Sequence, residues 1–179
     1  MSFRERYNRK MSLFFLIGLG LHIPVFVFLA LKNDHGLVST LALSAVILLG
    51  PLVAYMMRAQ GAVVPNLLAF AGMSYVGLLI HLGNGMIEMH FHVFIMLATM
   101  IVFAMRTPVL TAVVTIAVHH VAFFFFLPKS VFNYEASFGI VMLHAGFVIL
   151  EAIPVFLIAS KYKYFIDLQD TTLTQLVPI

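Results

Sequence analysis

Histidine is the residue type in this sequence whose number and placement could support chemistry. The chain has eight histidines and no cysteine. All except His35 lie in long apolar segments or at their ends, namely His22, His81, His90, His92, His119, His120 and His144. A lone histidine in a membrane commonly packs as a neutral hydrogen-bonding group between helices. Because ionisable groups are costly inside a bilayer, a cluster of them instead indicates a functional site.

The depths of these histidines predict that several of them meet. A helix rises about 1.5 Å per residue. Depth is counted here from the outer end of each apolar segment, with the orientation that the basic residues predict (see below). On this scale, His92 and His144 lie roughly 9 Å below the outer boundary of the membrane. On the same scale, His120 lies at about 10 Å and His119 at about 12 Å. Other ionisable groups flank this layer: His22 at a similar depth, Glu88 and His90 slightly above it, His81 near the outer surface and Glu151 near the middle.

The order of Glu88, His90 and His92 limits what one helix can present to one ion. Glu88 and His92 are four positions apart. They share a helix face, which suits two ligands or a ligand and its orienting partner. His90 points about 160–200° away from both at 3.6 residues per turn. Either His90 serves a second ion or neighbour, or the helix is irregular near the Gly83-Asn84-Gly85 turn.

The later ionisable residues follow the same geometry. His119 and His120 differ by about 100° around a helix, so one is expected to ligate while the other packs or orients. His144 and Glu151 are seven positions apart and share a face. Glu151 lies about two turns deeper, which suits a proton acceptor or coupling group better than a ligand of the same ion.

Imidazoles with carboxylates and without thiols favour a transition metal. Copper and iron are the leading candidates and zinc a further one, whereas calcium and magnesium prefer oxygen ligands. A pair of histidines on two helices could instead hold haem b. The sequence contains no His-Glu-x-x-His motif, phosphate-binding glycine loop or Ser-His-Asp arrangement. The predicted ligands, for one or two ions, are His90, His92, His119, His120, His144 and Glu88, with Glu151, His81 and His22 as supporting or coupling groups.

The segments that carry these residues are predicted to cross a membrane. Apolar residues make up 63% of the 179 positions and charged residues 9%, whereas a soluble domain is about half apolar and about a quarter charged. Each apolar segment is close to the ~20 residues that a bilayer core requires. The predicted class is an all-α integral membrane bundle of six transmembrane helices, over residues 11–31, 37–57, 63–82, 86–105, 109–127 and 138–160.

Lysine and arginine predict the orientation of the bundle. If the N-terminus is cytoplasmic, only Lys32 and Lys129 of the ten basic residues lie outside. The other eight lie inside: Arg4, Arg6, Arg9, Lys10, Arg58, Arg106, Lys161 and Lys163. This positive-inside bias predicts that both termini are cytoplasmic. Residues 1–31 could also be read as a secretory signal peptide, but the apolar run is too long and no cleavage site follows it.

The C-terminal segment is expected to leave the membrane as a helix. Residues 1–160 would form a transmembrane sensory domain, and residues 161–179 the start of a cytoplasmic signalling helix. The apolar spacing after Ser160 remains helical. This suggests a fragment of a longer protein whose output domain is missing, the alternative being a natural terminus that frays.

Two motifs in this chain resemble those of a known sensory region. The segment Glu88-Met89-His90-Phe91-His92-Val93-Phe94 is followed some 25 residues later by His119-His120. Together they resemble the multi-span N-terminal sensory region of some bacterial chemoreceptors, diguanylate cyclases and sensor kinases. The resemblance covers roughly the third to sixth predicted spans. It implies a sensory input module, and it carries over Glu88, His90, His92, His119 and His120; His144 and Glu151 depend on the depth argument alone.

Four functions compete at this point. The leading hypothesis is a non-enzymatic sensor in the bacterial inner membrane, acting in signal transduction such as chemotaxis and working as a homodimer without nucleic acid. The others are a histidine-rich membrane oxidase or desaturase, a haem-b electron carrier, and an ion or proton transporter using Glu88, Glu151 and the histidines as a relay. The outward position of the histidines disfavours an oxidase, and the lack of an internal repeat weakens the case for a transporter.

Overall fold

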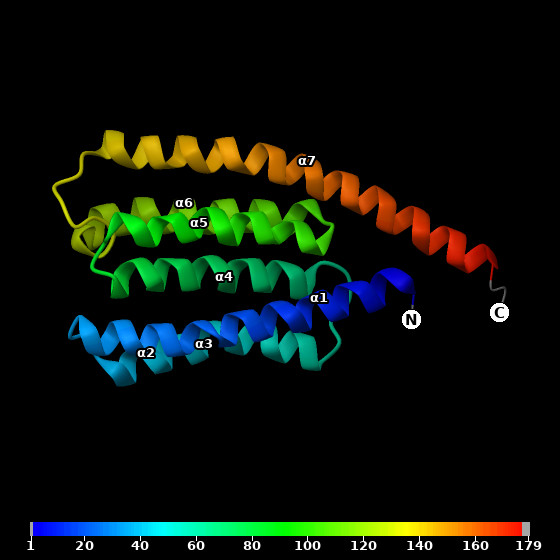
Figure 1. Cartoon of the computed structure of the whole chain (residues 1–179), viewed down its shortest axis with the longest axis horizontal. Helices are drawn as coiled ribbons and strands as arrows, with labels where there is room; N and C mark the ends of the chain where they lie inside the picture. Colours follow the sequence, from blue (N-terminus) through cyan, green and yellow to red (C-terminus); the bar gives the residue numbers. More distant parts are fainter. Residues whose placement is uncertain (1, 177–179) are drawn as a thin grey trace.

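The computed structural model describes residues 2–176, which form helices joined by short connections and contain no strand. The helices run side by side (Figure 1). In chain order they are α1 (Phe3–Gly20), α2 (His22–Lys32), α3 (Leu37–Met56), α4 (Val63–Leu82), α5 (Ile87–Thr99), the 3-10 helix η1 (Met100–Phe103), α6 (Arg106–Phe126), the 3-10 helix η2 (Pro128–Ser130) and α7 (Phe138–Leu176). The predicted all-α class is confirmed.

The lengths of the helices fit a protein that crosses the membrane several times. Five segments are long and apolar enough to span it, namely Phe3–Lys32, Leu37–Met56, Val63–Leu82, Arg106–Phe126 and Phe138–Leu176. The remaining apolar segment, Ile87–Phe103, consists of α5 and η1 and is shorter. It lies within the predicted span 86–105, so the count of six spans remains a prediction, as does the side of each terminus.

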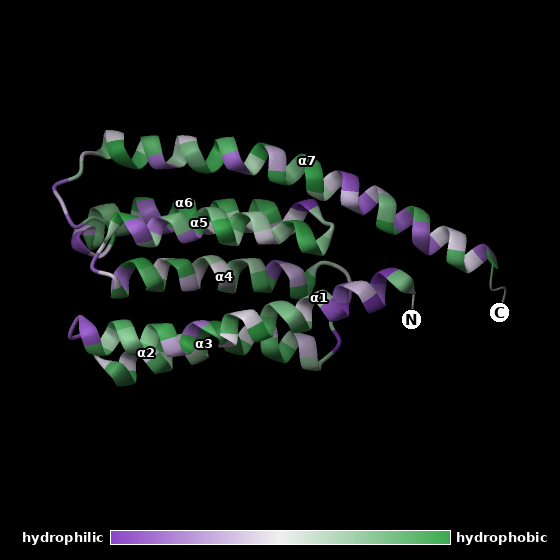
Figure 2. Cartoon of the chain, in the orientation of Figure 1, coloured by the Kyte–Doolittle hydropathy of each residue, from purple (hydrophilic) through white to green (hydrophobic). Residues whose placement is uncertain are grey.

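The outside of the bundle is largely apolar (Figure 2). Large side chains such as Phe14, Val38 and Phe126 are more than two-thirds exposed. A soluble monomer rarely exposes apolar surface this extensive, so lipid is the expected surroundings. In contrast, α4 buries most of its side chains and packs against α1, α2, α3, α5 and α6. It is the central helix around which the others are placed.

A break in the first apolar segment sets the position of one histidine. The proline ring at Pro24 has no N–H, so the carbonyl of Gly20 loses its usual helical partner. The regular helix is interrupted at Leu21, between α1 and α2, although the backbone there stays close to a helical conformation. His22 therefore stands at the start of α2, and its ring reaches α5.

The last helix extends well beyond the predicted sixth span. The 39 residues of α7 cover about 58 Å at 1.5 Å per residue, against a bilayer core about 30 Å thick. In Figure 1 its C-terminal part projects past the other helices, at the end of the bundle that also holds the N-terminus. The predicted signalling segment 161–179 continues α7 without a break to Leu176, and residues 177–179 lie outside the described part of the chain.

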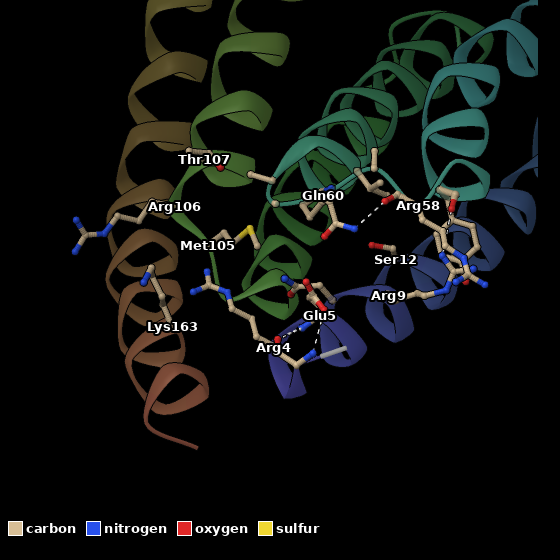
Figure 3. Close-up of a pocket in the computed structure, with 18 residues that line it drawn as sticks. Arg4, Glu5, Arg9, Ser12, Arg58, Gln60, Met105, Arg106, Thr107 and Lys163 are labelled. Atoms are coloured by element: carbon tan, nitrogen blue, oxygen red, sulfur yellow. Dashed lines mark hydrogen bonds between the residues drawn. The ribbon is translucent and has the colours of Figure 1, made fainter. Parts of the chain in front are cut away.

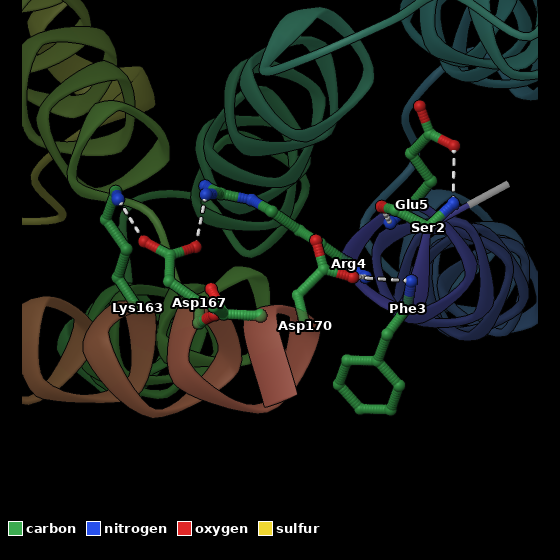
Figure 4. Close-up of polar contacts among 8 residues, drawn as sticks. Ser2, Phe3, Arg4, Glu5, Lys163, Asp167 and Asp170 are labelled. Atoms are coloured by element: carbon green, nitrogen blue, oxygen red, sulfur yellow. Dashed lines mark hydrogen bonds and ion pairs between the residues drawn. The ribbon is translucent and has the colours of Figure 1, made fainter. Parts of the chain in front are cut away.

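Polar contacts join α1 to this projecting part of α7 (Figure 4). Asp167 forms ion pairs with Arg4 and with Lys163. Asp170 Oδ1 accepts hydrogen bonds from the backbone N–H groups of Phe3 (2.7 Å) and Arg4 (3.3 Å). The first N–H groups of a helix have no partner within it and attract negative charge. Asp170 therefore caps α1 from another helix.

Candidate functional site

Three of the predicted ligands, each on a different helix, form one cluster. His90 belongs to α5, His120 to α6 and His144 to α7. The ring centroid of His90 lies 5.4 Å from that of His120 and 5.3 Å from that of His144. The remaining pair is 5.9 Å apart. His90 and His120 are buried and His144 is half-buried, so the bundle gathers three imidazoles between α5, α6 and α7.

The orientation of each ring in this cluster is fixed by its own helix. In each residue Nδ1 donates to the carbonyl oxygen four positions earlier, over 3.0 Å in His90, 3.0 Å in His120 and 2.8 Å in His144. A carbonyl oxygen can only accept, so Nδ1 carries the proton and Nε2 of the neutral ring keeps its lone pair. Metal-binding histidines are commonly held in this way, with the second ring nitrogen donating to a carbonyl or carboxylate.

The spacing of the rings fits ligands of one ion. Two imidazoles that bind an ion through Nε2 at about 2.1 Å, with tetrahedral or trigonal angles, have centroids about 5.3–5.6 Å apart. Two of the three observed separations fall in this range, and the third is slightly longer. In addition, Nε2 of His90 is buried without a hydrogen-bond partner among the described residues. An ordered ion or water is a common explanation for such an atom.

The donor atoms themselves do not converge on one point. Within residues 2–176, no group of three or more His, Asp or Glu side chains stands in a geometry that could hold a metal ion. An ion would have to draw the Nε2 atoms inward through ring rotations and small helix shifts. Binding of an ion at this cluster would therefore require the three rings to move from the positions they have in this structure.

An aromatic side chain that the sequence analysis did not single out covers the cluster. Phe132 stacks on His90, with centroids 6.0 Å apart and planes 15° apart, and meets His144 edge-on at 5.5 Å. Its side chain is buried, although it lies in the connection between η2 and α7. The adjacent Asn133 N–H donates to the carbonyl of Gly85 over 3.2 Å. The apolar pair Val131-Phe132, set in an otherwise polar loop after a proline, was the available sequence signal.

An apolar cavity of about 400 Å³ adjoins the cluster between α5, α6 and α7. His90, His120 and His144 line it together with apolar side chains and Tyr134. Its volume is within the range of small-molecule sites. A small ligand in this cavity would meet the rings directly.

His92 belongs to a separate pair and not to the cluster. Its Nε2 lies 2.9 Å from Nε2 of His22, and Nδ1 of His22 donates to the carbonyl of Gly18 over 2.8 Å. With its proton on Nδ1, neutral His22 accepts through Nε2, so His92 donates from Nε2–H. Two nitrogens bound to one ion at tetrahedral angles would stand about 3.4 Å apart. As placed, this pair shares a proton rather than an ion.

The remaining predicted histidines also have particular neighbours. His119 lies 5.4 Å from His120 by ring centroids, stacks on Phe123, and approaches Gly77 of α4 so closely that a Cβ there would meet its ring. Its Nδ1 is buried without a hydrogen-bond partner among the described residues. His119 thus packs beside the cluster. His81 interacts elsewhere: its Nδ1 is 2.9 Å from the Ser130 hydroxyl, and its ring is 4.9 Å from that of His35.

Neither acid is joined to the cluster. Glu88 is exposed on α5, and Glu151 is half-buried on α7. No hydrogen bond or ion pair between either acid and a histidine occurs in the described part of the chain. Of the predicted ligands, the fold therefore brings together His90, His120 and His144, places His119 beside them, and puts His92 and Glu88 in other surroundings.

Comparisons of the chain with protein-family models, with curated proteins and with solved structures find no match.

Proposed function

We propose that this chain is the transmembrane sensory input module of a bacterial signal-transduction receptor, and that His90, His120 and His144 hold a transition metal ion. The observation that supports the proposal is the set of three rings from three helices, each with its Nδ1 proton directed to a backbone carbonyl. The resemblance of the motifs around His90 and His120 to chemoreceptor and sensor-kinase input regions supports the receptor class.

Copper, iron and zinc are the ions that suit this set of ligands. The chain has no thiol, and imidazole is a good ligand for all three metals. Three protein ligands leave one position open in a four-coordinate site. The adjoining cavity would admit a small ligand to that position. The stimulus is therefore either the ion itself or a small molecule bound to it.

Element analysis and an absorption spectrum of the purified protein test the proposal together. We expect about one transition-metal ion per chain and no intense haem band, because three imidazoles gathered at one place suit a single ion, whereas a haem iron takes two axial ligands. A haem band would support the haem-b alternative, with the same histidines as ligands of the haem iron. Protein that contains neither metal nor haem after growth with copper, iron and zinc would exclude the proposal.

We further propose that both termini face the cytoplasm. Basic residues from four parts of the chain, including Arg4, Arg58 and Arg106, line one cavity at the end of the bundle that holds both termini. Such a concentration of positive charge is typical of the cytoplasmic side.

Cysteine labelling would check this orientation, because the natural chain contains no cysteine. In intact bacterial spheroplasts, Asn133→Cys should react with a membrane-impermeant maleimide. Gln60→Cys should react only after the membrane is permeabilised, because its connection lies at the opposite end of the bundle. The reverse pattern would refute the proposed topology.

The seventh helix is the proposed path of the signal. It carries His144 in the cluster, passes Glu151, and contacts α1 through Asp167 and Asp170. A rigid helix transmits a displacement at one end to the other, and a ligand needs only a few kcal/mol of differential affinity to shift such an equilibrium. We expect a homodimer, the commonest symmetric assembly, and an output domain attached beyond α7.

Spin labels would detect this movement. With labels on Gln60→Cys and Gln169→Cys, metal should change the distance between them by about 1–2 Å or more, the usual scale of helix shifts. The same labels on a His120→Phe background should not respond. Identical distances with and without metal would exclude α7 as the path.

Glu151 lies on α7 between the histidine cluster and the contacts with α1. Glu151→Gln should keep the metal but alter output from an attached signalling domain.

A further inference from the structure

A second cavity lies at the opposite end of the bundle from the histidines. Its volume is about 960 Å³, and it is an open cavity lined by the N-terminal part of α1, the α3–α4 connection, the start of α6 and α7. Figure 3 shows the side chains of Arg4, Arg9, Arg58 and Lys163 around it. Glu5 is the acid that lines it among the described residues.

The charges around this cavity are not balanced. Arg4 and Lys163 share one carboxylate, that of Asp167. Arg9 stacks over the ring of Tyr55 at 4.3 Å and donates to the carbonyl of Tyr55 over 3.2 Å. These contacts hold the Arg9 guanidinium in place without neutralising it. Among residues 2–176, no ion pair involves Arg9 or Arg58, so the cavity keeps an excess of positive charge.

The backbone at Arg58 has a conformation that glycine adopts more easily than arginine. Its φ is 56°, in the left-handed region. It follows the end of α3, and the next N–H, that of Ala59, donates back to the carbonyl of Ala54 over 3.0 Å. This is the helix-ending motif in which glycine is the usual residue. Arginine is less favourable there than glycine, as is each of the other non-glycine residues with a positive φ, Asp34, Asn84 and Ala104.

We propose that this cavity binds a phosphate-bearing anion, with Arg9 and Arg58 as its principal ligands and Arg4 and Lys163 beside them. Guanidinium groups match phosphate oxygens through paired hydrogen bonds. The anion is either the headgroup of an anionic phospholipid or a soluble phosphate, since the same ligands would bind both. Arg106 is not proposed as a ligand, because its guanidinium donates to the Ser160 hydroxyl over 2.8 Å and lies over the Phe156 ring at 5.2 Å. This proposal does not depend on the histidine site.

The test uses the full chain in phosphatidylcholine nanodiscs. Inorganic phosphate is titrated by calorimetry in one arm, and in the other phosphatidylglycerol is added and its retention is measured by native mass spectrometry. We expect saturable binding of one anion in one of the two arms, and that arm identifies the source.

Arg58→Gly separates binding from folding. It removes the charge and also relieves the backbone strain, so the anion should bind about tenfold more weakly while the melting temperature does not fall. Arg9→Gln, without a backbone change, should weaken binding similarly. The matched control is Lys10→Gln, which removes the same charge from α1 outside the cavity and should leave the affinity within about twofold. Equal losses in Lys10→Gln and Arg58→Gly, or no saturable binding in either arm, would overturn the proposal.

Discussion

Replacement of His120 by alanine should lower the affinity of the purified protein for the proposed metal ion by at least about 100-fold. Loss of a group that merely orients a ligand commonly costs 10–100-fold, so loss of a direct ligand should cost at least as much. His90→Ala and His144→Ala should have the same effect, because each ring supplies one Nε2 to the cluster. Element analysis after dialysis against a weak chelator measures the occupancy.

Two further variants make the result specific. His120→Phe keeps an aromatic ring of similar size in the buried position, so it should lose the metal while folding normally. His92→Ala removes a histidine of the separate pair with His22, and it should keep most of the metal. Full occupancy in His90→Ala, His120→Ala and His144→Ala would exclude the cluster. Strong loss of metal in His92→Ala alone would instead assign the metal site to the pair of His92 and His22.

Replacement of Gly85 by alanine should destabilise the protein by about 2–4 kcal/mol and disturb the proposed metal site. Gly85 has a φ of 71°, which L-residues with a Cβ rarely adopt. A Cβ at this position would lie 2.7 Å from backbone atoms of Phe132 and 2.9 Å from the N atom of Asn133. Backbone cannot move aside as a flexible side chain can. The connection that places Phe132 over His90 and His144 would therefore be displaced.

Two other glycines separate the causes of this effect. Gly61 has a φ of 65° but open space around a Cβ, so Gly61→Ala should show only the conformational cost of about 1–2 kcal/mol. Gly146 lies in α7 with open space and ordinary φ, so Gly146→Ala should be neutral or slightly stabilising. Thermal unfolding in detergent measures all three. Equal melting temperatures for the Gly85→Ala and Gly61→Ala variants would show that the contact with Phe132 is unimportant.

The sequence was sufficient to predict the class of this protein and the approximate limits of its helices. The apolar segments 37–57 and 63–82 closely match α3 and α4. They were recognisable because a bilayer admits only long apolar helices, and glycine, proline, asparagine and charges mark the connections. The predicted last span ended at 160, and the helix predicted to follow it is the continuation of α7 to Leu176. A membrane boundary is a change of surroundings, and a helix can continue through it.

Which histidines meet was decided by the tertiary structure. Counting residues along a helix gives the depth of a side chain, but not the direction in which the helix is rotated or which helix lies next to it. The sequence correctly separated the faces of His90 and His92, which differ by two positions. Only the packing of α5 between its neighbours directs His90 toward His120 and His144 and directs His92 toward His22. Likewise, the basic residues indicated an orientation one by one, and only the approach of α1, α3 and α7 combines them into one cavity. Both results depend on contacts between residues far apart in the chain, and local sequence periodicity contains no information about those contacts.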